Sequence, residues 1–371
     1  MKSIIPEMAE EALHKASDVK QIVMGLRGNF EQSLLESLAL GVNSARALIY
    51  TLESLPLPLL NNLITGDRRP LPSREQQTYI INQSRRLLEK DARELSHGLF
   101  PLESLRPTTS PLEHFSRWAH IMGDSTQSFW RRRHKKTTEF SEKVVDLHDY
   151  PDYYQRNFHH QTDGYLTEQS ARIYEHQVEL LFRGLADPMR RRLLKPLKRS
   201  LEGVETPKIL EIACGPGSFT RFLSQALPHA KITATDISPY YIHHAKKRFI
   251  DNSKIDFMVA NAENLPFKTN EFDAVVAVFL HHELPQRVRE KIIDESLRVC
   301  KARGFWGLLD SIQLADDPNL DWAIEAFPQT FHEPFFMNYI KKPLIPYLES
   351  KHKRQFTQKN HLLSKAVFTQ G

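Results

Sequence analysis

Residues 208–218 read KILEIACGPGS, and this stretch decides the fold. Its first half, up to Ala213, is a short apolar run with a single acid, which is typical of a strand buried on both faces of a parallel sheet. The second half is a glycine-rich turn, after which apolar residues recur at helical spacing from Phe219 to Leu227. A strand, a tight glycine turn and a helix predict the first unit of a doubly wound α/β sheet with a ligand crevice at the turn.

A second strand, predicted at residues 232–235, ends in Asp236. An acid at this tip lies where it can accept hydrogen bonds from the two hydroxyls of a ribose. Ser238 and Pro239 then predict an N-cap and the first residue of the next helix. A dinucleotide fingerprint requires a third glycine where Thr220 stands, and the Gly-Lys-Ser/Thr of a P-loop is absent.

An acid four residues before the first glycine of Gly-x-Gly, as in Glu211 and Gly215, resembles motif I of the class I S-adenosylmethionine-dependent methyltransferases. The later segments are similar to the ubiquinone/menaquinone-type members in order and spacing. They comprise a third strand with an adenine-binding loop (256–267), a fourth strand (272–279), a turn before a fifth strand (298–304, then 305–309) and a closing hairpin (356–361 and 365–369). The resemblance covers roughly residues 205–371. It implies a Rossmann-like, seven-stranded, mostly parallel sheet with a closing antiparallel hairpin.

The resemblance also implies the cofactor, S-adenosylmethionine, and its contacts. Glu211, Gly215 and Gly217 would line the methionine end, and Asp236 would hold the ribose hydroxyls. The adenine and the remaining cofactor contacts would fall to Asn261, Ala262, Ala213, Ile237 and Phe279. Two structural alternatives stay open: Glu211 as a solvated charge at the strand edge, and Asp236 as a helix-capping acid.

Methyl transfer by an in-line SN2 step mainly requires that the protein align the cofactor with the acceptor and exclude water. A base is needed only when the acceptor loses a proton. His282 and Glu283 follow the fourth strand, at the edge where ligands bind, and are the candidates for that role. A packing role for His282 is the alternative. Tyr165 lies in an aromatic and histidine-rich segment, 153–166, which predicts a lid over the site, with core packing as its alternative. No metal is predicted, because the adjacent His-His pairs lack ligand spacing and no Cys-x-x-Cys occurs.

Three regions are predicted along the chain. Residues 1–145 form a helical domain that matches no nameable family, residues 146–204 a helical lid or connector, and residues 205–371 the α/β domain. The clearest helix of the first region follows Ser110 and Pro111 and is expected to present one apolar face, made of Phe115, Trp118, Ala119, Met122, Phe129 and Trp130.

Composition narrows the function classes. The 371 residues carry 50 Lys and Arg against 45 Asp and Glu, a mild excess that permits an anionic partner without requiring one. Cys214 and Cys300 are expected to be reduced thiols. The first 21 residues lack the apolar core of a signal peptide, so a cytoplasmic protein is expected. The most apolar stretch, 49–64, is too short and too interrupted to be a transmembrane segment.

Three functions stay open. The leading one is O-, N- or C-methylation of a small molecule, with the helical region shaping the acceptor pocket or a homodimer interface. The second is an RNA-directed methyltransferase that uses the basic runs 131–136 and 190–199, which are otherwise solvated helix ends. Methylation of base amino groups is disfavoured, because Asn/Asp-Pro-Pro-Tyr/Phe does not follow the fourth strand. The third is a cofactor-binding protein without catalysis.

Overall fold

A computed structural model describes residues 4–66, 71–141 and 147–369, and it contains the predicted sheet. The strand order is β3-β2-β1-β4-β5-β7-β6. The first five strands of this order are parallel, and β7 runs antiparallel to both β5 and β6. The bounds are β1 (Lys208–Ile212), β2 (Lys231–Asp236), β3 (Ile255–Val259), β4 (Phe272–Val278), β5 (Cys300–Ser311), β6 (Phe356–His361) and β7 (Ser364–Thr369). The predicted parallel sheet with a closing hairpin is confirmed.

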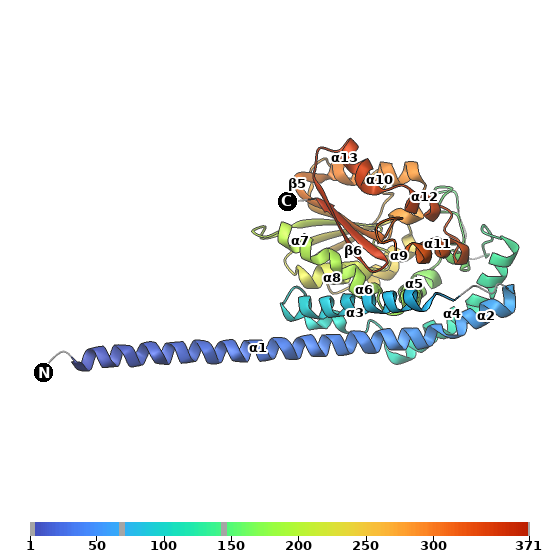
Figure 1. Ribbon diagram of the computed structural model, residues 1–371. Coiled ribbons are helices and arrows are strands. Elements are labelled where there is room, and N and C mark those ends of the chain that lie inside the picture. The colour runs from blue at the N-terminus through green and yellow to red at the C-terminus, as the bar shows by residue number, and fades with distance from the viewer. Residues whose placement is uncertain (1–3, 67–70, 142–146, 370–371) are drawn as a thin grey trace.

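Helices cover both faces of the sheet because its strands are apolar on both sides (Figure 1). In β1, Ile209 belongs to one core, and Leu210 and Ile212 belong to the other. The first core is closed by α7 (Leu194–Ser200), α8 (Ser218–Ala226) and α9 (Pro239–Arg248). The second is closed by α10 (Gln286–Val299), α11 (Asp321–Thr330), α12 (Phe336–Lys341) and α13 (Leu344–Lys351). The result is a three-layer sandwich.

The turn predicted at residues 298–304 is wrong, because β5 already begins at Cys300 and runs through Gly304. A Cβ at Gly304 would lie only 2.8 Å from the carbonyl oxygen of Asp273 in the neighbouring strand. Beside it, the register of β4 and β5 shifts between Phe272 and Ala274. The glycine therefore permits a close approach of two strands at an irregularity.

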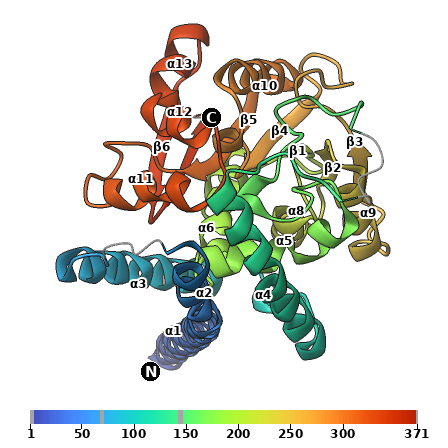
Figure 2. The same cartoon turned by 90° about the vertical axis from the view of Figure 1, so that its right-hand side faces the viewer.

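The N-terminal region is helical, as predicted, and packs on the α/β domain (Figure 2). It consists of α1 (Ile4–Ser54), α2 (Pro56–Thr65), α3 (Arg74–Ser96), the short η1 (Leu102–Leu105) and α4 (Pro111–His134). Ala39 of α1 and Ala92 and Leu95 of α3 belong to the same core as α7 and α8. The predicted boundary between residues 145 and 146 lies outside the described residues. None of the described helices has the length and apolar character needed to cross a bilayer.

Helix α4 begins as predicted, but its buried face was predicted wrongly. Ser110 accepts a hydrogen bond from the N–H of Glu113, and Pro111 is the first helical residue. Phe115 and Trp130, however, are exposed. The buried residues are instead Arg117, Ile121, Ser125 and Arg131. Polar groups can take these positions because they find partners: the Arg131 guanidinium, for example, donates to the carbonyl of His160 at 2.9 Å.

The arginine triplet that begins the second basic run is not a solvated surface, although Lys195 and Arg199 of the same run are exposed. Arg190, Arg191 and Arg192, in the short helices α6 (Ala186–Arg190) and η3 (Arg191–Leu193), are all buried. Arg191 and Arg192 both pair with Asp91 of α3, which is fully buried. These arginines therefore connect the N-terminal helices to the α/β domain, and neither the RNA-binding nor the solvated interpretation holds for them.

Candidate functional site

The turn after β1 is held in a strained shape at the carboxyl edge of the sheet. Ala213 and Gly215 have φ of +53° and +56°. A positive φ costs energy in a residue with a side chain, as in Ala213, and such strain is concentrated at functional sites. Gly217, the N-cap of α8, has φ of +83°, and a Cβ there would lie 2.6 Å from the ring of Phe249.

Asp236, at the tip of β2, is tied to this turn. One of its carboxylate oxygens accepts the N–H of Gly215 and the other the N–H of Ser238, each at 2.9 Å. Burial raises the pKa of Asp236 to about 6, against the lowering effect of these backbone hydrogen bonds. Ser238 lies at the N-cap position, as predicted, but its hydroxyl does not cap α9. It donates to the carbonyl of Tyr165 and so joins the 153–166 segment to β2.

A cavity of about 780 Å³, called here the crevice, opens at the tips of β1, β2 and β4. Nine of the residues predicted for the site line it together: Ala213, Gly215, Asp236, Ile237, Asn261, Ala262, Phe279, Tyr165 and Glu283. Glu211, Gly217 and His282 are not among its walls. The sequence therefore named nine of the 19 residues that line the crevice.

Glu211 lies beneath the crevice. It is buried, and it accepts a hydrogen bond from the hydroxyl of Thr220 at 2.6 Å. Burial, the dominant effect, raises its pKa to about 8. Because it is neither solvated nor at the cavity wall, its contribution in this structure is to hold the strand β1 and the helix α8 together.

The 153–166 segment and helix α5 (Glu168–Leu181) close the crevice with aromatic rings. The rings of Phe158 and Tyr165 stack with centroids 5.1 Å apart. The hydroxyl of Tyr153 donates to Glu263 at 3.0 Å, which joins the segment to the loop after β3. The sequence indicated a lid here but named only Tyr165. The density of aromatic residues in the segment was the signal for Tyr153, Tyr154 and Phe158, which also line the crevice, whereas Tyr174 on α5 lies outside the segment and had no such signal.

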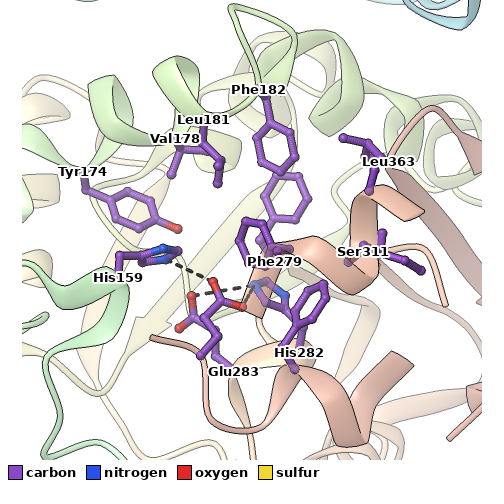
Figure 3. Close-up of a pocket in the computed structure, with 15 residues that line it drawn as sticks. His159, Tyr174, Val178, Leu181, Phe182, Phe279, His282, Glu283, Ser311 and Leu363 are labelled. Carbon is purple, nitrogen blue, oxygen red and sulfur yellow. Dashed lines mark ion pairs between the residues drawn. The ribbon is translucent and has the colours of Figure 1, made fainter. Parts of the chain in front are cut away.

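A second cavity, of about 620 Å³, adjoins the crevice and is called here the apolar cavity (Figure 3). Its apolar walls come from α5, α11, α12 and the hairpin turn, with Val178, Phe182, Ile324 and Phe327 among them. Tyr174, Phe279 and Glu283 line both cavities. The lining of each begins only after residue 150, so the described part of the N-terminal region lines neither cavity.

Polar side chains gather at one end of the apolar cavity (Figure 3). His282 lies with Nδ1 2.5 Å from Asp310 and Nε2 3.8 Å from both Glu283 and Glu333. The Tyr165 hydroxyl donates to Glu283 at 2.9 Å. Burial lowers the pKa of His282, but the charges of Asp310 and Glu333 outweigh it and raise the value to about 10. A histidine that stays protonated is a poor base, so the predicted base role gains no support from this arrangement.

Sequence reasoning did not single out Asp310 or Glu333. Asp310 lies near the end of β5 and Glu333 follows α11. Each is a lone acid in its own stretch of sequence, and only the fold places both beside His282. A pattern within one segment cannot signal such a pair.

Comparison with known proteins agrees with this geometry. Residues 209–304 match a family model described as a methyltransferase domain. The chain carries a class I S-adenosylmethionine-dependent methyltransferase domain. It is similar to a demethylmenaquinone methyltransferase of Thermotoga maritima, with 32% identity over 145 residues, 39% of this chain and 59% of the relative. A fatty-acid O-methyltransferase of Mycolicibacterium smegmatis is 27% identical over 34% of this chain and 44% of the relative.

These similarities extend over only part of each relative. The chain spans 59% or less of the length of the curated relatives it matches. Among solved structures, a methyltransferase of Aquifex aeolicus aligns at 18% identity with a TM-score of 0.34, over 51% of this chain and 96% of that one. The family model matches residues within the α/β domain, and the N-terminal helical region lies outside that match.

The cofactor of this family fits the crevice. Asp236 presents a buried carboxylate at its wall, held by two backbone N–H groups. The left-handed turn at Gly215 keeps the wall free of a side chain where the ligand would approach the backbone. Asn261 and Ala262 lie across the crevice, after β3.

Proposed function

We propose that this protein transfers the methyl group of S-adenosylmethionine to a small-molecule acceptor bound in the apolar cavity. The observation that carries the proposal is the shared wall: Tyr174, Phe279 and Glu283 face both the crevice and the apolar cavity. When bound, the cofactor supplies a methyl group on a sulfonium, which needs no further activation. The protein has to align the two reactants, with reacting atoms about 3–3.5 Å apart, and to exclude water.

The residues of the crevice have distinct roles in this proposal. Asp236 would hold the ribose hydroxyls, and Asn261 and Ala262 would contact the adenine. The turn from Ala213 to Gly217 would lie beside the methionine end. The lid, residues 153–166, would keep water out of the crevice, since its aromatic rings form one wall of it.

The shape of the apolar cavity favours an acceptor with an apolar body and one polar head. The walls are mostly aliphatic and aromatic, whereas Tyr165, His282 and Glu283 meet near its junction with the crevice. These three would contact the polar head, where the methyl group arrives. The names of the relatives, which act on demethylmenaquinone and fatty acids, favour the same class of molecule. O-, N- and C-methylation all remain compatible with it.

Filling the apolar cavity tests this proposal. Ala323, on α11, lines the cavity and is small, so Ala323→Phe should block the acceptor. Incubation with radiolabelled S-adenosylmethionine and a metabolite extract should label an apolar acceptor with the unaltered protein, and at least about tenfold less with the variant. The affinity for the cofactor, measured by calorimetry, should not change.

Glu325→Phe is the matched control, since Glu325 is exposed on the same helix. It should label the acceptor at the normal rate. Equal labelling by Ala323→Phe and Glu325→Phe would place the acceptor elsewhere and contradict the proposal.

Nucleic acid is the weaker alternative. Arg190–Arg192 are buried, and Arg131 and Arg133 donate to the carbonyls of His160 and Ile64. Both basic runs are therefore engaged at least partly within the fold. A homodimer stays a prediction. Helix α1 exposes apolar side chains, among them Leu34, Leu38 and Leu52, and sedimentation at several concentrations would test for self-association.

A further inference from the structure

Four potential metal ligands converge at the polar end of the apolar cavity. They are His159, His282, Glu283 and Glu333, which come from the lid, the loop after β4 and the segment after α11. His159 Nε2 lies 3.2 Å from a Glu333 oxygen. His159, Glu283 and Glu333 each offer one donor atom within 4.8 Å of the other two.

The spacing of these atoms matches a coordination shell. A zinc-sized ion bonded at about 2.0–2.1 Å to four tetrahedral donors holds those donors about 3.3 Å apart. The observed separations are 3.2 Å for His159 to Glu333 and 3.8 Å from His282 Nε2 to Glu283 and to Glu333. His159, Glu283 and Glu333 already form one group of donors, and His282, which lies outside that group, would have to move toward it to share the ion.

Glu333 supplies an observation that the cluster alone does not. Its side chain has 0% exposure, and it lines the apolar cavity. Neither of its carboxylate oxygens accepts a hydrogen bond from any described residue. A buried carboxylate without hydrogen bonds is costly, and a coordinated cation removes that cost.

The side chains that contact the four potential ligands are also those expected around a metal site. His282 Nδ1 lies 2.5 Å from Asp310, so Nε2 is the nitrogen left to bind an ion, which would displace the proton that His282 holds in the metal-free protein. A carboxylate on the far nitrogen is the usual partner of a metal-bound histidine, because it fixes the tautomer and the ring. Tyr165 orients Glu283 in the same way. His159 itself has φ of +53°, a strained value for a residue with a side chain, and it lines the cavity.

We propose that His159, His282, Glu283 and Glu333 bind one divalent transition-metal ion at the end of the apolar cavity. Two imidazoles and two carboxylates suit zinc, cobalt, iron or manganese better than calcium, which takes oxygen ligands only. If the proposed function holds, the ion faces the acceptor, and the acceptor class narrows to molecules that offer an oxygen atom to a cation.

A second histidine and acid cluster provides the comparison. Glu53, His114 and His176 also offer three donors within 4.8 Å. Here, however, the two carboxylate oxygens are already paired with the imidazoles, at 2.6 Å and 3.1 Å. Glu53 therefore has a hydrogen-bond partner at each carboxylate oxygen, whereas Glu333 has none at either among the described residues. Hydrogen bonding alone accounts for the arrangement of Glu53, His114 and His176.

The test is a titration of the cofactor-free, chelator-treated protein with Co²⁺, followed by its visible absorption, and with Zn²⁺ by calorimetry. We expect one ion per chain and a visible band typical of nitrogen and oxygen ligands. Glu333→Gln and His282→Ala should weaken binding more than tenfold, and Asp310→Asn should weaken it by about 10–100-fold. Glu53→Gln should bind as the unaltered protein does.

Absence of saturable binding, binding unchanged in folded Glu333→Gln and His282→Ala, or binding lost in Glu53→Gln would overturn the proposal. Circular dichroism identifies folded variants, and Glu283→Gln takes the place of any variant that does not fold. Calorimetry with S-adenosylmethionine on the same samples separates the two proposals. Cofactor binding without metal binding rejects the metal site alone, and metal binding without cofactor binding rejects the proposed function alone.

Discussion

Asp236→Asn should lower the affinity for S-adenosylmethionine about 100-fold at pH 8. The carboxylate is placed to accept hydrogen bonds from two ribose hydroxyls, and a hydrogen bond to a charged group contributes about 1.5–3 kcal/mol. Two such bonds amount to about 3 kcal/mol, and about 1.4 kcal/mol corresponds to a tenfold change in affinity. Asparagine keeps the shape of the side chain, but its NH2 group cannot accept one of the two N–H groups, of Gly215 and Ser238, that Asp236 accepts, so circular dichroism has to show that the variant is folded. Calorimetry measures the dissociation constant directly.

The pH dependence of binding provides an independent check on this site. The pKa of Asp236 is raised to about 6, so lowering the pH through 6 protonates the carboxylate and removes its charge. Between pH 8 and pH 5 the affinity should fall about tenfold, as expected for the loss of one ionised group. Asp236→Asn should not show this loss. Asp256→Asn, an exposed position on β3, is the control and should bind normally; equal affinity in both variants would move the cofactor away from Asp236.

Asp91→Ala should lower the free energy of unfolding by about 3–5 kcal/mol, the usual cost of removing one partner from a buried ion pair. Asp91 is fully buried and pairs with both Arg191 and Arg192. Burial acts to raise its pKa, but the two guanidinium charges outweigh that effect and hold the pKa below its ordinary value. Without the carboxylate, buried Arg191 would lose its ion pair, and Arg192 beside it would keep, among the described residues, only its ion pair with Glu94. Urea denaturation measures the change.

The matched control for Asp91→Ala is Glu168→Ala. Glu168 pairs with Lys247 at 3.0 Å, and the two side chains are 59% and 60% exposed. An exposed pair contributes between 0 and about 1 kcal/mol, so this variant should unfold nearly like the unaltered protein. A small effect of Asp91→Ala, similar to that of Glu168→Ala, would show that the arginine cluster is solvated in solution.

The sheet was predictable because its signals are local. The apolar run of β1, the glycine turn and the acid that ends β2 are each contained in a few neighbouring residues. The hairpin strands β6 and β7 were predicted within one residue of their bounds for the same reason. The crevice residues at the strand tips were predictable as well, because the carboxyl ends of parallel strands meet at one edge.

The remaining features depend on contacts between distant segments. Arg191 and Arg192 form a basic run in the sequence, and they are internal because they pair with Asp91 and Glu94 of the distant helix α3. The burial of Arg131 on α4 depends on the carbonyl of His160. Glu333 is one glutamate among many until the fold places it beside His159 and His282. A contact between two distant segments cannot be predicted from the sequence pattern of either segment alone.

A crystal structure with S-adenosylhomocysteine tests the central claim most directly. We expect the adenosyl group in the crevice, its ribose hydroxyls on Asp236, and its sulfur beside the wall of Tyr174, Phe279 and Glu283, open toward the apolar cavity. Density for the ligand elsewhere, or a sulfur shut off from the apolar cavity by that wall, would contradict it.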